Sequence, residues 1–398
     1  MPYTPERQYH SVDLPEYLDN GQPDITPRRR FDQKQHERLR RHWDTFIQEP
    51  WQPLNRPNSV ISVSSSTRAV FLGEISRLCE EQLGVGAIQL EFPGGPYRSS
   101  FRAHLENSTS VIITRRTFHG RATMEAMILD RLYSHKANVP APFGFNGLVL
   151  IQEDLLGERL ADMEVLQTAE GYIRLISAAL AGLNRLHTMA QDIGLDQMVY
   201  PMGQHTDWLV ALLDRSMVVG TYLGVPSPTV PVAALFDLLT LIRPRFIKWD
   251  ARPGNAIVRD DETIGWFDWE HCCARHHLDD MVWLLCDESL PDHLASEETQ
   301  LIESYLNLFA DGRSEGEAHE YLRSMGVFHC CTRLGRLLHA KARGSWTDAD
   351  QQLEKPLGTS LTAAVRLARR GARWAEHSDY ARPLAAWFRQ VAEQLPKL

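Results

Sequence analysis

The segment FIKWDARPGNAIV (residues 246–258) and the nearby GWFDWE (residues 265–270) decide how this sequence is interpreted. Asp250 precedes Asn255 by five residues, and Asp268 stands at the end of the next apolar run. Phosphoryl transfer uses these residue types, because one Asp orients a hydroxyl and accepts its proton while an Asn and another Asp hold Mg²⁺ on nucleotide phosphates. The alternative is three loop residues without a chemical role, since Asp and Asn are also frequent in turns.

Upstream of this segment, the apolar pattern predicts a small sheet with helices attached. We expect a helix from Ser66 to Gly84, three antiparallel strands over 87–92, 101–106 and 110–115, a helix after Gly120, and a strand over 148–151. Pro140 and Pro142 end the second helix, because proline cannot continue one.

Downstream of residue 154, helical periodicity dominates. Segments 172–189, 205–219 and 229–242 are predicted helices, two short strands bracket residues 255–268, and the remainder is predicted to be helical. We therefore expect an α+β fold with an N-terminal extension (1–60), a lobe with a small antiparallel sheet (61–153) and a larger, mainly helical lobe (154–398).

The composition excludes several classes of protein. The net charge of −9, from 42 basic and 51 acidic residues, argues against a nucleic-acid partner. No apolar run reaches the roughly 18 residues of a membrane span, and the charged start of the sequence does not resemble a secretory signal. The cysteines, six in number and four of them in adjacent pairs, indicate reduced thiols rather than disulfides. We expect a cytoplasmic protein.

Two short stretches, 271–277 and 329–331, combine histidines with adjacent cysteines. Adjacent cysteines chelate one zinc ion poorly, so we expect buried thiols and surface histidines there. No metal other than Mg²⁺ is predicted.

With these motifs, residues 66–390 resemble the aminoglycoside phosphotransferase and choline kinase family, a branch of the protein-kinase-like fold. That family's catalytic loop usually reads His-Gly-Asp-x-x-x-x-Asn and is followed by Ile-Asp-Trp-Glu. Here Lys248 and Trp249 replace the His-Gly pair, while Phe267-Asp268-Trp269-Glu270 follows. The resemblance implies that ATP and Mg²⁺ bind in the cleft between the lobes and that the γ-phosphoryl group moves to a small-molecule hydroxyl, as in an amino sugar or amine alcohol.

The resemblance also implies roles for individual residues. Asp250 would be catalytic, and Asn255 and Asp268 would bind the metal. The residues that would bind the nucleotide are Gly94, Gly95 and Ser99 in a phosphate loop, Arg115 with its partner Glu125, and Gln152, Glu153 and Leu155 in a hinge that holds adenine. Arg116 is the rival of Arg115, because period-2 alternation places the two on opposite faces, and we favour Arg115.

Two further positions support the catalytic loop in this family. Asp280 would brace the loop, although it is also a candidate helix N-cap. His187, at the end of a predicted helix, is assigned a structural role.

The aromatic and acidic residues near the motif leave the acceptor open. Trp249 either packs under the loop or projects into the acceptor pocket, and alternation with Ile247 favours packing. Trp249, Trp266, Trp269 and Trp283 are candidates for an aromatic cage around a quaternary amine, although alternation assigns at least half of them to the core. Acidic residues could attract a cationic acceptor or form a solvated surface: Glu270, Asp279, Asp287, Glu288 and Asp292.

Two other functions compete with this interpretation of the sequence. A protein kinase is disfavoured, because the short segment between Asp268 and Asp280 leaves no room for an activation segment. A non-catalytic relative that binds nucleotide or acts as a scaffold is the alternative, favoured by the altered loop and disfavoured by the retained Asp250, Asn255 and Asp268. The sequence leaves open the acceptor, ATP versus GTP, the oligomeric state and the role of residues 1–60.

Overall fold

The computed structural model describes residues 65–93, 99–116, 118–204, 206–342 and 360–397. They form two compact units, which we call the sheet unit (up to residue 136, and 140–154) and the helical unit (137–139, and from 155 onward). The predicted extension over residues 1–60 lies outside the described residues, as do the phosphate-loop candidates Gly94 and Gly95.

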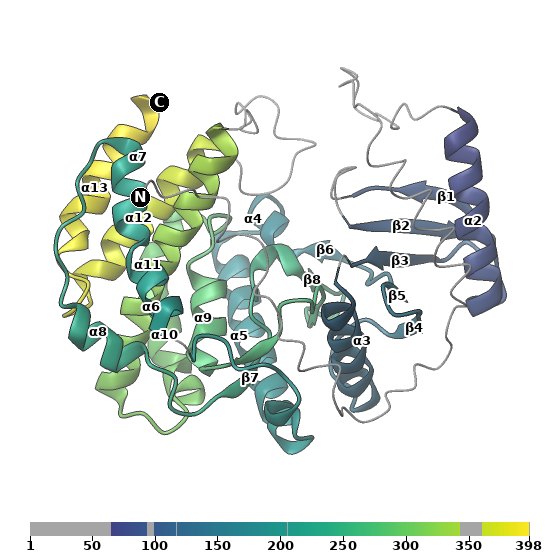
Figure 1. Cartoon of the computed structure of the whole chain (residues 1–398), viewed down its shortest axis with the longest axis horizontal. Helices are drawn as coiled ribbons and strands as arrows, with labels where there is room; N and C mark the ends of the chain where they lie inside the picture. The colour runs from purple at the N-terminus through teal and green to yellow at the C-terminus, as the bar shows by residue number, and fades with distance from the viewer. Residues whose placement is uncertain (1–64, 94–98, 117, 205, 343–359, 398) are drawn as a thin grey trace. The chain divides into compact units, whose positions relative to one another are not determined.

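The described residues of the sheet unit form a five-stranded antiparallel sheet and two helices (Figure 1). Its elements are α2 (Ser65–Leu83), β1 (Ala87–Glu91), β2 (Ser100–Leu105), β3 (Ser110–Arg115), α3 (His119–Ser134), β4 (Pro142–Phe145) and β5 (Val149–Glu153). The strand order is β1-β2-β3-β5-β4, so β4 forms an edge. A strand that starts with a proline is tolerated at an edge, where a missing N–H donor costs little.

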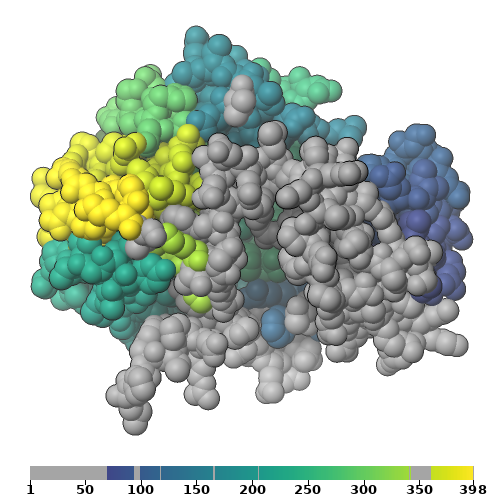
Figure 2. Space-filling view, turned by 90° about the horizontal axis from the view of Figure 1, so that it is seen from above, coloured from purple at the N-terminus to yellow at the C-terminus, as the bar shows by residue number. Residues whose placement is uncertain are grey.

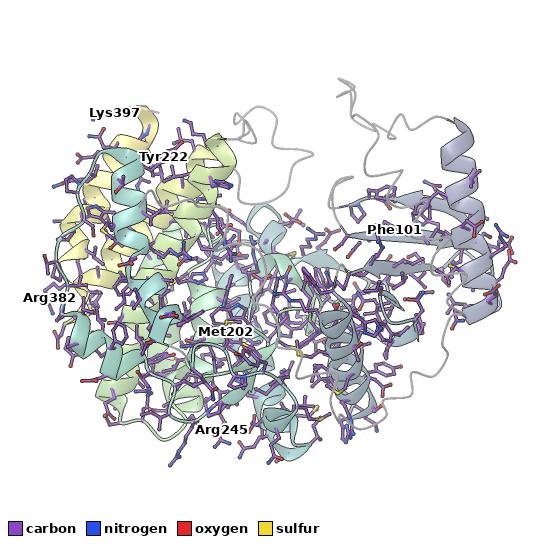
Figure 3. The ribbon with its side chains drawn as sticks, in the orientation of Figure 1. Phe101, Met202, Tyr222, Arg245, Arg382 and Lys397 are labelled. Atoms are coloured by element: carbon purple, nitrogen blue, oxygen red, sulfur yellow. The ribbon has the colours of Figure 1, made fainter. Side chains whose placement is uncertain are left out.

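The core of the sheet unit lies between α2 and one face of the sheet. Phe101, labelled in Figure 3, and Ala103 alternate inward along β2. The Phe101 ring meets the Phe71 ring of α2 edge to face with centroids 5.6 Å apart. Gly84 ends α2 with a φ of +76°, a conformation that glycine adopts without the steric cost of a Cβ. The predicted helix end at Gly84 is confirmed.

The helical unit carries the candidate catalytic motif (residues 245–275) on short strands between helices. Before the motif come β6 (Glu158–Arg159), α4 (Met163–Leu166), α5 (Ala169–Asp192), α6 (Thr206–Leu213), α7 (Arg215–Leu223) and α8 (Val232–Leu239). The motif spans β7 (Arg245–Ile247), the 3₁₀ turn η5 (Pro253–Asn255), β8 (Ala256–Val258), β9 (Ile264–Trp266) and β10 (Cys273–Arg275). After it come α9 (His277–Leu285), α10 (Ala295–Phe309), α11 (Glu315–Ala342), α12 (Leu361–Glu376) and α13 (Leu384–Gln394).

The C-terminal helix α13 packs against a helix from the middle of the sequence. Helix α13 lies beside α7, and the Trp387 indole donates a hydrogen bond of 2.9 Å to the Val225 carbonyl. Figure 2 shows the same neighbourhood from outside, with the yellow surface of the C-terminal helices against the teal surface of the middle segment. Residues far apart in sequence therefore build one helical body.

Most of the helices and strands predicted from the sequence are present in the structure, and the prediction differs from the structure mainly at short elements. The predicted helix 205–219 is two helices, α6 and α7, with a break at Asp214. The edge strand β4 and the pair β7 and β10 were not predicted, because strands of three or four residues carry too little alternation to recognise. Within the described part of the chain, every helix is too short or too polar to cross a bilayer.

Candidate active site

The hairpin of β8 and β9 brings two of the predicted site residues together. Ala256 pairs with Trp266 in the antiparallel register, so Asn255 and the residues after Trp266 lie at the same end of the hairpin. The Phe267 amide donates to the Asn255 carbonyl at 3.2 Å. Asp268, the next residue, therefore lies close to Asn255.

Asp250 joins this pair through the Asn255 side chain. The Asn255 amide nitrogen donates to the Asp250 carboxylate at 2.8 Å and to the Asp250 carbonyl at 3.0 Å. Both hydrogen bonds use Nδ2, so they orient Oδ1 as the atom that can bind a cation. Oδ1 and the Asp268 carboxylate are hard oxygen ligands of the kind that Mg²⁺ prefers when nucleotide phosphates and water complete its shell. The donor set fits the predicted metal.

The backbone at the site is unusual. Trp249, Asp250 and Asp268 all have left-handed conformations, with φ values of 46°, 59° and 62°. A non-glycine residue in this region costs about 1–2 kcal/mol, so surrounding contacts must hold it there. Strained residues of this kind gather at functional sites, where the backbone aims a side chain.

Asp280, in α9, is the main brace of the loop. Its carboxylate accepts hydrogen bonds of 2.8 Å from the main-chain amides of Lys248 and Trp249 and lies 2.8 Å from the His187 ring nitrogen Nε2. The predicted bracing role of Asp280 is confirmed, whereas His276, not Asp280, is the N-cap of α9. His187 is buried behind Asp280, in agreement with its structural assignment.

We expect Asp280→Asn to impair the loop as well as the fold. An amide presents a donor to one of the two main-chain N–H groups, and a buried unsatisfied polar group costs about 1–3 kcal/mol. Urea unfolding should show this loss, and kcat should fall in the same variant. Glu320→Gln is a matched control, since Glu320 also accepts two consecutive main-chain amides, from Asp379 and Tyr380. The control should lose stability and keep kcat, and an equal loss of kcat in both variants would contradict the assignment.

The side chain of Lys248 is completely buried. A lysine within an apolar run is normally assigned to solvent, yet this side chain is 0% exposed. Its ammonium donates to the Asp268 carbonyl at 3.0 Å and to the Asp250 carbonyl at 3.5 Å, and lies 5.1 Å from the centre of the Trp269 ring. Burial lowers the pKa of Lys248, while the carboxylates of Asp250, Asp268 and Asp280 oppose that shift.

Trp249 packs, as predicted, but for a different reason. Strand β7 ends at Ile247 and the φ of Trp249 is positive, so strand alternation does not extend to this residue. Its ring meets Trp283 edge to face at 5.3 Å and tilts against Trp208 at 6.4 Å, and the side chain stays half-buried. Trp266, Trp269 and Trp283 are buried, so among the four candidate cage residues Trp249 alone has partial exposure.

We expect Trp249→Gly to be more stable than Trp249→Ala by about 1–2 kcal/mol. Both variants lose the ring contacts, but glycine alone relieves the left-handed backbone. The midpoints of urea unfolding measure the difference. An alanine variant at least as stable as the glycine variant would show that the backbone strain is absent. A wild-type melting temperature with an altered acceptor profile would show that the ring serves the acceptor instead.

Four of the five acidic residues considered as a site for a cationic acceptor pair with arginines within the protein, whereas Glu270 lies 3.7 Å from His271. Arg275 pairs with Asp279 at 2.6 Å, and Arg252 pairs with both Asp287 and Glu288. Arg333 also pairs with Glu288, and Arg369 pairs with Asp292. Burial alone would raise the pKa of Glu288, but Arg333 and Arg252 lower it to about 2. These four carboxylates are paired with arginines, so they do not favour a cationic acceptor.

In the sheet unit, the ion pair predicted for Glu125 is formed by a different arginine. Arg116 donates from Nε and Nη2 to the Glu125 carboxylate at 2.6 and 2.7 Å, and both side chains are buried. Its third nitrogen, Nη1, lies 3.4 Å from the Ser99 hydroxyl. The preference for Arg115 as the partner of Glu125 is therefore wrong. The strand ends at Arg115, and strand alternation does not govern the residue after it.

The hinge candidates have definite local contacts. Gln152 is buried within β5 opposite Ile112, and the Glu153 amide donates to the Ala141 carbonyl at 2.9 Å. Leu155 is buried as the first residue of the helical unit after β5. The Glu153 amide is thus already engaged by Ala141 within the sheet unit.

The cysteine and histidine stretches contain no metal site among the described residues. All six cysteines are buried free thiols, as predicted. The prediction of surface histidines is wrong for three of them, because His276, His277 and His329 are buried. Burial lowers the pKa of His276 to about 3. In the described part of the chain, no three His, Cys, Asp or Glu side chains cluster so as to hold a metal.

Comparison with known proteins gives structural neighbours at low similarity. No protein-family model matches the chain, and no curated protein matches its sequence. A macrolide 2'-phosphotransferase from Brachybacterium faecium is 16% identical with a TM-score of 0.47, and the match covers 74% of this chain and 98% of that one. A choline kinase from Streptococcus pneumoniae is 11% identical with a TM-score of 0.45, covering 75% and 96%. An AMP-bound spectinomycin phosphotransferase is 13% identical with a TM-score of 0.47, covering 68% and 91%.

Proposed function

We propose that this protein is an ATP- and Mg²⁺-dependent phosphotransferase that moves the γ-phosphoryl group to a hydroxyl of a small molecule. The observation that supports this most is the hydrogen bond of 2.8 Å from Asn255 to the Asp250 carboxylate, at the end of the hairpin that also carries Asp268. Three unrelated turn residues would have no reason to converge in this way. A base, an amide oxygen and a second carboxylate are the groups that phosphoryl transfer requires.

In the proposed reaction, Asp250 acts as the general base. Its carboxylate takes the proton of the acceptor hydroxyl while the hydroxyl oxygen bonds to the γ-phosphorus. The bond from that phosphorus to the β–γ bridging oxygen breaks, so the products are ADP and a phosphate monoester. Magnesium, when bound, neutralises charge on the phosphate oxygens, and Asn255 Oδ1 with the Asp268 carboxylate would hold it.

The residues proposed to bind the nucleotide belong to the sheet unit, except for Leu155, the first residue of the helical unit after β5. Because Arg116 pairs with Glu125 and its Nη1 is directed toward Ser99, we assign the phosphate-binding cation to Arg116. Gly94 and Gly95 are proposed as the turn that approaches the phosphates. Gln152, Glu153 and Leu155 are proposed as the hinge that meets adenine, and within it the Glu153 amide already donates to the Ala141 carbonyl.

The test is a thermal-shift panel on the full chain. ATP, ADP and GTP are added with and without Mg²⁺, followed by hydroxyl compounds that include amino sugars, amine alcohols and uncharged sugars. A ligand at 100 times its Kd stabilises a protein by about 2.7 kcal/mol, which is a shift of several degrees. We expect stabilisation by ATP that increases with Mg²⁺. No response to any nucleotide would contradict the proposal.

A further inference from the structure

Lys248 is a buried cation placed between the two site aspartates. The Lys248 ammonium donates to the carbonyl of Asp268 and lies within 3.5 Å of the carbonyl of Asp250. It therefore links the loop before β8, which contains Asp250, to the loop after β9, which contains Asp268. Its own main-chain amide is held by Asp280 at 2.8 Å. Both ends of this residue are therefore fixed within the site.

The two carbonyls that Lys248 contacts belong to strained residues. Asp250 and Asp268 both have positive φ, and each side chain is aimed by a backbone that an L-residue rarely adopts. The Asn255 amide supports the Asp250 carbonyl as well, at 3.0 Å. The Lys248 ammonium contacts both strained carbonyls, and its positive charge strengthens such hydrogen bonds.

Burying a lysine is energetically unfavourable if its side chain only fills space in the core. Transferring an ammonium from water to the protein interior is unfavourable, and an apolar side chain of similar length fills the same space at lower cost. The aromatic faces of Trp269 and Trp266, 5.1 and 5.9 Å from the ammonium, offset part of that cost. A role in holding the two loops accounts for the charge, whereas a packing role does not.

We propose that Lys248 is a positioning residue that holds the main chains of Asp250 and Asp268 in the arrangement needed to bind Mg²⁺ and transfer phosphate. This inference rests on the proposed function. Lys248 touches neither the substrate hydroxyl nor the phosphate in this scheme, and it acts through the residues whose carbonyls it contacts. Loss of a residue that orients metal ligands typically weakens metal affinity by about 10–100-fold.

The test compares Lys248→Met and Lys248→Arg with wild type in the full chain. Methionine fills a similar volume without a donor, and arginine keeps a charged donor. Two quantities are measured at fixed ATP. The first is the Mg²⁺ midpoint, the Mg²⁺ concentration that gives half of the Mg²⁺-dependent increase in melting temperature. The second is the increase in melting temperature that ATP gives without Mg²⁺. We expect Lys248→Met to raise the Mg²⁺ midpoint about 10–100-fold and leave metal-free ATP binding unchanged. Lys248→Arg should restore the midpoint to within a few-fold of wild type.

Arg370→Met is the matched control. Arg370 is also a buried cation that donates to two main-chain carbonyls, those of Asp287 and Leu290, but it lies in α12. The control should alter stability and leave the Mg²⁺ midpoint as in wild type. A purely structural role for Lys248 would make the two variants behave alike, which would overturn the inference.

The remaining outcomes are also decisive. If wild type shows Mg²⁺-dependent ATP stabilisation and Lys248→Met keeps the same midpoint, the inference fails while the proposed function stands. If wild type shows no such stabilisation, both fail. Should Lys248→Met not fold, Lys248→Gln replaces it, with an expected rise of at least about 10-fold. If neither neutral variant folds, Lys248 serves folding and the inference is overturned.

Discussion

Asp250→Asn is expected to lower kcat by about 10²–10⁴-fold, the usual contribution of a general base. The amide cannot take the proton of the acceptor hydroxyl. Its oxygen can still accept the hydrogen bond that Asn255 donates at 2.8 Å, so the loop should persist. Mg·ATP affinity should therefore stay within a few-fold of wild type, because Asn255 and Asp268 are unchanged. Steady-state kinetics on phosphoryl transfer, or on Mg·ATP hydrolysis without an acceptor, measures the loss.

Asp260→Asn is the control for Asp250→Asn. Asp260 lies exposed in the turn between β8 and β9, so its substitution removes one carboxylate charge near the site in sequence without touching the site. It should keep wild-type kcat. If Asp250→Asn turned over at the wild-type rate, another group would have to be the base, and the assignment of Asp250 would be wrong.

Asp268→Ala is expected to abolish the Mg²⁺-dependent part of nucleotide stabilisation. The variant removes a carboxylate that contributes both charge and ligand oxygen, whereas Asn255→Ala removes a neutral ligand and should only weaken the effect. The thermal shift given by ATP without Mg²⁺ should survive in both variants. Titration of Mg²⁺ at fixed ATP distinguishes the loss of the Mg²⁺ effect in Asp268→Ala from its weakening in Asn255→Ala.

Backbone strain must be separated from metal binding in this experiment. Asp268 has a φ of 62°, so alanine there also costs about 1–2 kcal/mol of stability. Asp268→Asn is the matched variant, because Asn tolerates the left-handed region better and keeps one oxygen. It should show wild-type-like stability with a raised Mg²⁺ midpoint. An unchanged Mg²⁺ response in Asp268→Ala would remove Asp268 from the metal site.

The local parts of this site could be predicted from sequence because they depend on spacing within a short stretch. Asn255 reaches Asp250 across a five-residue loop, and the hairpin that follows carries Asp268 to the same end. The apolar periodicity of α2, β2 and β3 similarly gave their ranges to within a residue or two. Asp280 was recognised through the family resemblance, and its contacts with the loop amides confirm the role.

The parts that could not be predicted depend on partners distant in sequence. The ion pairs of Glu288 join it to Arg252 and Arg333, and only the folded chain brings these three together. The burial of Lys248 requires two carbonyls and two tryptophan rings that surround it in the fold.

The choice between Arg115 and Arg116 failed for a local reason. Alternation holds only within a strand, and Arg116 is the first residue beyond β3. Its side chain is therefore placed by the Glu125 carboxylate of α3 and not by the pleat of the sheet. The period-2 alternation of side chains therefore does not predict the orientation of residues just beyond a strand end, such as Arg116.

Phosphoryl transfer by this protein can be followed directly by ³¹P NMR of the full chain incubated with Mg·ATP and a pool of hydroxyl compounds, with Asp250→Asn in parallel. We expect loss of the γ-phosphate resonance, growth of ADP and a new phosphate monoester in the wild-type sample, and almost none of these changes with Asp250→Asn. If wild type bound Mg·ATP without any transfer or hydrolysis, the protein would be a non-catalytic nucleotide-binding protein and the proposed function would be wrong.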